Sequence, residues 1–341
     1  MNPEIIESRK FREEIFREAR ALAKTDKCFL CEQKNVHFCN SHLIPHFILK
    51  NIAHNGKVKN FGCFAFKGDA SFDSECGLSN AGTFHFICRK CDSYYFSDYE
   101  NESNIRNSIF SSRFFAQIII KNFLSRLYKK NTESHIPDLL SKKCDVFFET
   151  QFDSDLELDK RDFYEDLMRQ RGIIENSLLN RHHILFQKKL TYKVPFAVQA
   201  HMALHRNING EIINDVYCRD KDYKIRSMHL CIFPLQEETI IILFIDKFAK
   251  KRYNKFINSL IALPLEEQLQ YITYLAFKYT EDIFFSPQLP DCVFQNKSLQ
   301  LLAEENYDRP HLGCEPDYIN NNYRPVDFHD IPNLLSQQYR I

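Results

Sequence analysis

Apolar residues recur at helical spacing at the start of the chain and then break into shorter runs. One face of residues 4–24 is apolar, which predicts a helix; its apolar positions are Ile5, Phe11, Ile15, Ala19 and Leu22. Ser41 stands where a helix cap is expected, and Pro45 falls at the start of a helix that runs to about Ala53. Residues 54–87 hold five of the eight glycines, which favours short strands and loops. Helices are predicted over 92–102 and 104–130, the second one long and amphipathic.

The second half of the chain begins with a change of composition. Residues 131–170 carry eleven acids and five bases, as expected of a connecting segment. A helix is predicted over 160–189. Strands follow over 192–246, where Asn209-Gly210 is a strong hairpin signal. Two helices are then expected over 247–262 and 265–283. The pattern predicts an α+β protein.

Two Cys-x-x-Cys pairs, Cys28–Cys31 and Cys88–Cys91, lie 56 residues apart. Such a pair is typical of a zinc knuckle, because two thiolates of one tight turn can reach the same ion at about 2.3 Å. Two pairs supply four thiolates, the closed tetrahedral set of a structural zinc site. The alternative is four reduced thiols in an apolar core.

The remaining cysteines are scattered singly, and residues 1–16 lack the apolar core of a signal peptide. No stretch approaches the 18 or so apolar residues of a membrane span. We therefore expect a cytoplasmic protein with free thiols and bound metal, without membrane contact. Residues 1–130 hold 20 Lys and Arg against 14 Asp and Glu, whereas the whole chain has no net charge. This basic half could meet the phosphates of a nucleic acid, or it could attract the acidic half.

The segment between the cysteine pairs holds the residues that could do chemistry. His42 could act as a general base, since imidazole titrates near neutral pH; it could equally be a capping or core histidine. A divalent ion such as Mg²⁺ or Mn²⁺ would need oxygen ligands, and Asp92, Glu100 and Asn80 could supply them. Cations that could contact phosphate, or simply be solvated, lie in the same region: Lys57, Lys59, Arg89 and Lys90.

The order of these parts resembles the zinc-containing branch of the HNH (ββα-metal) endonucleases: Cys-x-x-Cys, His-x-x-Pro, then Cys-x-x-Cys opening a helix. The resemblance covers residues 25–105. It implies a treble-clef or ββα-metal zinc module in which Cys28, Cys31, Cys88 and Cys91 hold structural zinc. It also implies that His42 is the general base and Pro45 the motif proline. Asn80 would orient His42, and Asp92 would fall at a position that binds the catalytic Mg²⁺ or Mn²⁺.

Two positions depart from that family's pattern. Ser41 replaces the metal-binding acid, and Asp92 replaces the usual His or Asn, so the metal site would be rebuilt, with Glu100 as a possible ligand. The resemblance implies an endonuclease acting on nucleic acid, DNA more than RNA, in an anti-phage or restriction system. The alternative is a non-catalytic zinc module that binds nucleic acid or protein.

The expected organisation has three parts. A zinc-binding HNH-like domain with flanking helices spans 1–130, and the acidic connecting segment spans 131–170. An α+β domain spans 171–341, with an antiparallel sheet and flanking helices. This last part has no motif that points to a reaction, and it could bind a protein partner.

Overall fold

A computed structural model of the chain describes residues 3–62, 71–144, 152–176, 182–215, 218, 220, 222–307 and 326–341. Its helices are α1 (Pro3–Leu22), α2 (His46–Ile52), α3 (Arg89–Phe96), α4 (Glu102–Arg106), α5 (Ser112–Glu133), α6 (Ile136–Cys144), α7 (Phe152–Glu175), α8 (Lys250–Ala262), α9 (Leu265–Tyr279), α10 (Asp291–Phe294) and α11 (Lys297–Tyr307). Its strands are β1 (Ser41–His42), β2 (Lys57–Gly62), β3 (Ser71–Gly77), β4 (Thr83–Phe84), β5 (His182–Leu190), β6 (Phe196–Met202), β7 (Met228–Pro234), β8 (Thr239–Asp246) and β9 (Ile283–Phe285). The predicted α+β class is confirmed.

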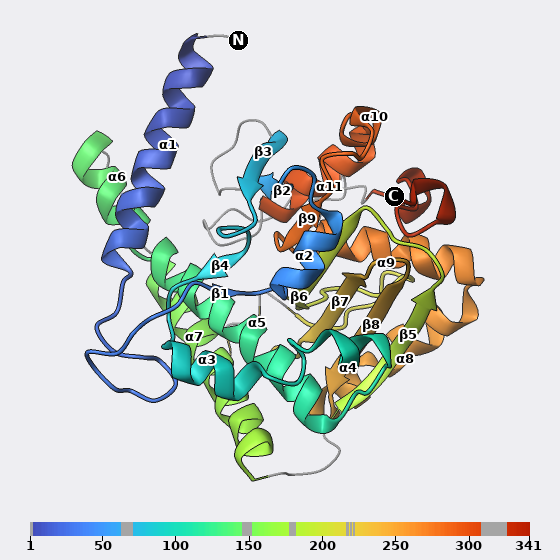
Figure 1. Cartoon of the computed structure of the whole chain (residues 1–341), viewed down its shortest axis with the longest axis horizontal. Helices are drawn as coiled ribbons and strands as arrows, with labels where there is room; N and C mark the ends of the chain where they lie inside the picture. Colours follow the sequence, from blue (N-terminus) through green and yellow to red (C-terminus); the bar gives the residue numbers. More distant parts are fainter. Residues whose placement is uncertain are drawn as a thin grey trace.

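Seven of these strands form one antiparallel sheet in the order β3-β2-β9-β6-β7-β8-β5 (Figure 1). Strand β9 lies between β2 and β6, so the hairpin of β2 and β3 extends the sheet of the C-terminal strands. The short strands β1 and β4 form a separate antiparallel pair. Residues from both halves of the sequence therefore share one sheet.

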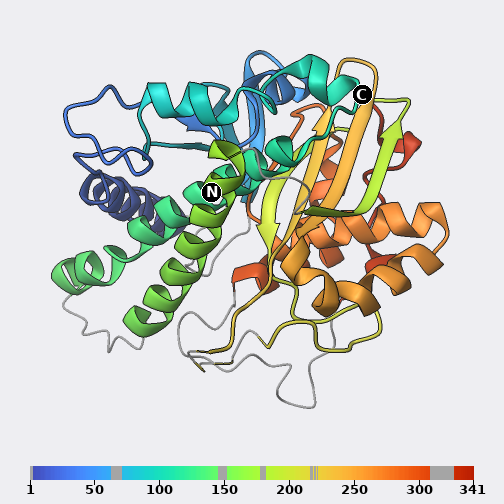
Figure 2. The ribbon, with the colours of Figure 1, turned by 90° about the horizontal axis from the view of Figure 1, so that it is seen from below.

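Helices cover both faces of the large sheet (Figure 2). In β8, Ile240, Ile242 and Phe244 face a core shared with α2, α3 and α5. The alternate residues, Ile241, Leu243 and Ile245, face a core shared with α8 and α9. Alternation of side chains along a strand explains why β8 is apolar throughout, since both of its faces are buried.

The first of these cores also contains the cysteine pairs. Cys28, Cys88 and Cys91 belong to the same cluster of buried residues as α5 and the inner face of β6, β7 and β8. Helix α5 is buried around most of its circumference and not only along one stripe, in contrast to the amphipathic pattern predicted for 104–130. It lies between the two cysteine pairs and the sheet, and its side chains pack against both.

Several predicted element boundaries differ from the observed ones. The helix predicted over 104–130 is interrupted: Ser108 has a positive φ of 54°, and α5 begins afresh with Ser111 as its N-cap. The helix predicted over 160–189 ends at Glu175, and His182 begins β5, which pairs with β8. The last predicted helix ends at Tyr279, and 283–285 form strand β9, which lies between β2 and β6 in the sheet.

The Asn209-Gly210 turn is present but does not join two paired strands of the sheet. Gly210 has a φ of 77°, and the turn is closed by an isolated bridge between Arg206 and Ile212. Strand β6, which precedes the turn, pairs with β7 and β9. The turn chemistry was correctly predicted, whereas the strand that follows it was not.

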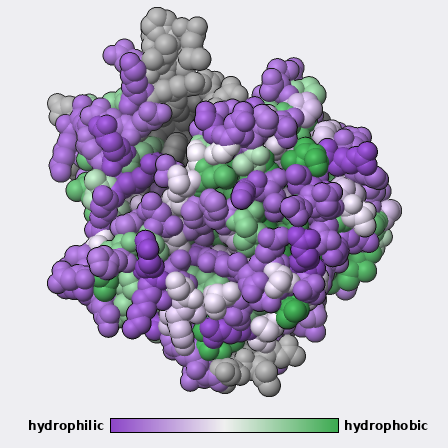
Figure 3. Space-filling view, in the orientation of Figure 1, coloured by the Kyte–Doolittle hydropathy of each residue, from purple (hydrophilic) through white to green (hydrophobic). Residues whose placement is uncertain are grey.

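The surface seen in Figure 3 is mainly hydrophilic, with small and separate apolar patches. Helix α1 extends from the body beside α6 (Figure 1), and Ile15 and Ala19 of α1 pack against Leu139 of α6. Among the described residues, no helix combines the length and apolar character that crossing a membrane requires.

Candidate metal centre and the adjoining charged cluster

The two cysteine pairs meet in space. The Sγ atoms of Cys28, Cys31, Cys88 and Cys91 all lie within 4.8 Å of one another. The sulfurs of Cys31 and Cys88 are 3.9 Å apart. Zinc bound tetrahedrally at about 2.3 Å sets neighbouring sulfurs about 3.8 Å apart. The cluster is therefore close enough to hold a metal ion such as zinc.

Local backbone geometry explains why each pair forms a knuckle. The first pair lies in the loop after α1, where the N–H of Glu32 donates to the carbonyl of Cys28 at 2.8 Å and Glu32 has a φ of 58°. The second pair opens α3, with Cys88 as the residue before its first turn. The N–H of Cys88 donates to the sulfur of Cys28 at 3.3 Å, which links the second knuckle to the first.

Charge gives a further reason to expect a cation among these sulfurs. Burial, and then the neighbouring thiol groups, raise the pKa of Cys91 well above its ordinary value. Several thiolates crowded together repel one another unless a cation neutralises them. Of the four cysteines, Cys31 is the most exposed, whereas the others are buried. Such a closed four-sulfur set fits a structural site rather than a catalytic one.

A charged cluster lies directly beside the second knuckle. Asp92, the residue after Cys91, accepts a hydrogen bond of 2.5 Å from the hydroxyl of Ser41. Its Oδ1 also lies 2.9 Å from the ammonium of Lys121 on α5. The same ammonium lies 2.8 Å from Oε1 of Glu100. The structure thus brings Asp92 and Glu100 together around the ammonium of Lys121, a residue that was not among the predicted site residues.

Lys121 is entirely buried. Its side chain is 0% exposed, whereas those of Asp92 and Glu100 are 22% and 34% exposed. Its ammonium also lies 3.8 Å from the ring centre of Phe96, a cation–π contact. Burial is the main cause that raises the pKa of Glu100, and Lys121 opposes that rise. The ammonium is consequently held on one side by an aromatic ring and on the other by two carboxylates.

His42 occupies strand β1, next to Ser41. Its Nε2 lies 2.9 Å from the carbonyl oxygen of Leu78, which can only accept, so Nε2 carries the proton. In the neutral ring, Nδ1 then has its lone pair free. Burial lowers the pKa of His42, so the ring is neutral at pH 7. Lys121 and Asp92 also influence this pKa, in opposite directions, because both charges lie nearby.

Two residues near His42 differ from the sequence-based expectation. Ser41 does not cap a helix; Pro45 precedes α2, and the Ser41 hydroxyl bonds to Asp92. Asn80 lies exposed in the turn between β3 and β4, where its N–H donates to the carbonyl of Gly77. The carbonyl of Leu78 makes the bond that orients His42, the role that was predicted for Asn80.

The cations proposed for phosphate contact fall into two groups. Lys57 pairs with Glu75 at 3.2 Å, and Lys59 pairs with Asp291 at 3.6 Å with only 12% of its side chain exposed. Arg89 and Lys90 are exposed in the first turn of α3, beside the cysteine cluster. In the described parts of the chain, neither of these two has an ion-pair partner.

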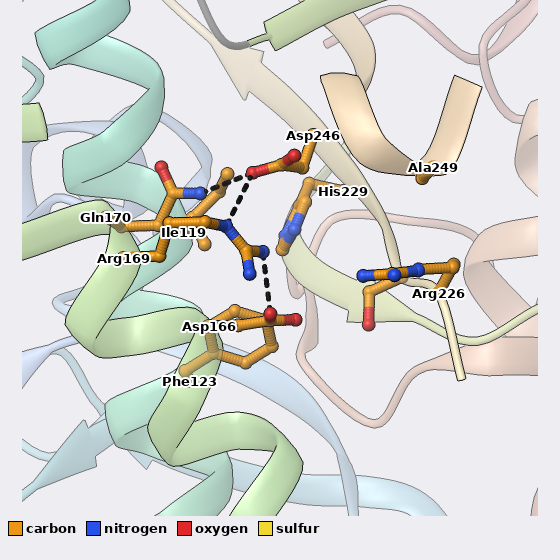
Figure 4. A pocket seen from close by; sticks show the side chains of 10 residues that line it. Ile119, Phe123, Asp166, Arg169, Gln170, Arg226, His229, Asp246 and Ala249 are labelled. Atoms are coloured by element: carbon orange, nitrogen blue, oxygen red, sulfur yellow. Dashed lines mark hydrogen bonds and ion pairs between the residues drawn. The ribbon is translucent and has the colours of Figure 1, made fainter. Parts of the chain in front are cut away.

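A second polar cluster lies between α7 and the sheet (Figure 4). Arg169 pairs with Asp166 at 2.6 Å, and Asp246 accepts from Gln170 at 2.7 Å. His229 points toward the same space. The cavity measures about 10 Å³, room for about one water molecule. These contacts join α7 to the sheet. The cavity is too small for a ligand larger than a water molecule.

No protein-family model, curated protein or solved structure matches the chain.

Proposed function

We propose that this protein is an HNH-like endonuclease that hydrolyses phosphodiester bonds of nucleic acid, with His42 as the general base on a four-cysteine zinc module. The observation that carries the proposal is the bond between Nε2 of His42 and the carbonyl of Leu78. It fixes the tautomer and the orientation of the ring, and leaves Nδ1 able to accept a proton.

In the proposed step, Nδ1 of His42 removes a proton from a water molecule. The water oxygen forms a bond to phosphorus, the bond from phosphorus to one sugar oxygen breaks, and that oxygen takes a proton from solvent. Arg89 and Lys90, in the first turn of α3, would contact the phosphates on either side of the bond that is cleaved. The Ser41–Asp92 hydrogen bond links β1 to α3. It therefore fixes the position of His42 relative to the cysteine cluster.

The substrate and setting follow from the same resemblance that suggested the reaction. We expect DNA to be cut in preference to RNA, and the protein to serve as an effector of anti-phage or restriction defence. The C-terminal sheet and its helices would then bind a protein partner. Zinc would supply structural rigidity, and a divalent ion such as Mg²⁺ or Mn²⁺ would be the usual source of positive charge at the reacting phosphate.

A second candidate is a non-catalytic zinc module that binds nucleic acid or protein. One observation favours it: the ammonium of Lys121 already contacts both carboxylates that were predicted to hold a catalytic metal. In that case, Asp92, Glu100 and Lys121 would form a buried ion cluster that only stabilises the fold.

Cleavage assays distinguish these candidates. Plasmid DNA, single-stranded DNA and RNA would be incubated with zinc-loaded protein, with and without Mg²⁺ or Mn²⁺. The proposal predicts cleavage by the wild type and loss of at least about 100-fold in His42→Ala. His46→Ala is the matched control. The ring centres of His46 and His42 lie 5.3 Å apart in an edge-to-face arrangement, but His46 has no role in the proposed step. Binding without cleavage by the wild type would favour the second candidate, and cleavage that survives His42→Ala would refute the assignment of the base.

A further inference from the structure

The position of Lys121 bears on which cation serves the proposed reaction. Helix α5 carries Lys121 after three consecutive isoleucines, Ile118 to Ile120, and the residue is buried with them. A lysine is rarely buried completely unless it is paired. Here its partners are the two carboxylates nominated as ligands for the catalytic metal, at 2.9 Å and 2.8 Å.

The packing leaves the ammonium little freedom to move away. Phe96 of α3 lies 3.8 Å from Nζ, and the rings of Phe84 and Tyr99 lie at 6.0 Å and 5.9 Å. Tyr99 is itself fixed, because its hydroxyl donates to the carbonyl of Leu43 at 3.2 Å. A divalent ion bound between Asp92 and Glu100 would meet a fixed positive charge within a few ångströms.

The charges of the cluster lead to the same conclusion. Asp92 and Glu100 together carry two negative charges, and Lys121 neutralises one of them. The hydroxyl of Ser41 contributes a further hydrogen bond to Asp92 at 2.5 Å, and Ser41 stands at the position where the HNH pattern has a metal-binding acid. An uncharged residue at that position reduces the negative charge available to a divalent ion. The uncharged Ser41 and the buried Lys121 therefore both act against the binding of a divalent ion between Asp92 and Glu100.

We propose that the ammonium of Lys121 takes the place of a divalent cation between Asp92 and Glu100, so that this centre binds no metal ion beyond the one in the cysteine cluster. As a statement about catalysis, the inference rests on the proposed function: hydrolysis at His42 then requires no added Mg²⁺ or Mn²⁺. Lys121 is a positioning residue, because it is wholly buried and acts through Asp92 and Glu100, the two carboxylates that it contacts.

A manganese titration tests this inference without any assay of activity. Zinc-loaded protein would be titrated with Mn²⁺, and the free ion followed by electron paramagnetic resonance. The wild type is expected to bind no Mn²⁺ in the millimolar range. Lys121→Met is expected to gain one Mn²⁺ site, which Asp92→Asn in the same background removes. Lys57→Met, which frees the exposed Glu75, is the control and should gain none.

Two results would overturn the inference. One is that the wild type binds a Mn²⁺ ion and Asp92→Asn does not, since this would show that a metal ion displaces the ammonium of Lys121. The other is a folded Lys121→Met protein that gains no site. If Lys121→Met fails to fold, the titration of the wild type decides alone.

A second readout separates positioning from a merely structural role. Removal of the Lys121 charge should raise the pKa of His42, because that charge disfavours the imidazolium; the titration of His42 by nuclear magnetic resonance measures this shift. An unchanged pKa of His42 in folded Lys121→Met would contradict the positioning role.

The same samples would be assayed for cleavage. Cleavage without added divalent ions supports the inference, whereas cleavage that requires Mg²⁺ and Asp92 refutes it. No cleavage under any condition, with the expected manganese result, would refute the proposed function and leave the inference about Lys121 standing.

Discussion

Substitution of Lys121 by methionine should cost the fold far more than loss of a surface lysine. Methionine has a similar length and removes only the ammonium, so packing against Phe96 is largely kept. Two carboxylates then lose a partner that was 0% exposed and lay within 3 Å of each. Breaking a buried ion pair by removing one partner costs about 3–5 kcal/mol, and the partial exposure of Asp92 and Glu100 places this case at the lower end, about 3 kcal/mol. We expect a loss of this size in the free energy of unfolding.

Urea denaturation of zinc-loaded protein at pH 7.5 measures this loss. Lys57→Met is the matched control: its ammonium pairs with Glu75 at 3.2 Å, but both side chains are well exposed. Such a surface pair contributes no more than about 1 kcal/mol. Addition of Asp92→Asn to Lys121→Met should recover part of the loss, since one of the unpaired charges is removed. A loss in Lys121→Met no larger than that of the control would refute the reasoning, and would mean that water reaches the cluster.

Three further predictions concern other parts of the molecule. Chelation of the metal should lower the melting temperature by at least ~10 °C, because the cysteine cluster belongs to the core that contacts the sheet; differential scanning fluorimetry that shows no change would contradict this. Burial lowers the pKa of His229 to about 3. Since an unfolded histidine has a pKa of about 6.5, the unfolded state takes up the proton first as the pH falls, and His229 should cost about 2 kcal/mol of stability at pH 5 relative to neutral pH. His229→Phe should lose that much less between pH 7.5 and pH 5 in urea titrations, and an equal loss in both proteins would show that His229 does not titrate as described. Substitution of both Arg89 and Lys90 by alanine should reduce the slope of log affinity against log salt by about 2 for any nucleic acid that binds, and a fluorescence-anisotropy titration with an unchanged slope would place the phosphates elsewhere.

The local features that depend on short-range chemistry were predictable from the sequence. The spacing of Cys28–Cys31 and Cys88–Cys91 indicated one cluster, and the apolar runs around residues 231–235 and 239–245 correspond to the paired strands β7 and β8. The side-chain pattern of a strand buried on both faces is an unbroken apolar run, which was recognisable by its length.

Features that depend on tertiary contacts were not predictable in the same way. Strand β9 has only three residues, Ile283–Phe285, and its place between β2 and β6 depends on partners more than 80 residues away in sequence. The bond from His42 to Leu78 uses a backbone carbonyl, which every residue has, so no side-chain pattern could indicate it. The first half of α7 carries the alternating acids of the segment 131–170, and a charge pattern alone could not distinguish a helix from a linker.

Lys121 is the functional candidate that sequence reasoning missed, although a signal was present. Lys121 and Asn122 break an apolar run between Ile118–Ile120 and Phe123–Leu124 in a helix, and Lys121 is charged. Such a residue must either reach the surface or find buried partners. The partners are acids of α3 and of the segment that follows it, and only the packing of α5 against α3 identifies them.

The zinc content of the purified protein tests the central claim most directly, since every argument about His42, Asp92 and Lys121 starts from the module that the four cysteines hold together. Native mass spectrometry of protein prepared without added metal should show one zinc ion per chain. Cys31→Ser should lose the ion, whereas Cys39→Ser, which changes a nearby thiol outside the cluster, should keep it. A wild type that holds no zinc even after exposure to the ion, or a Cys31→Ser protein that holds it as tightly, would contradict the account.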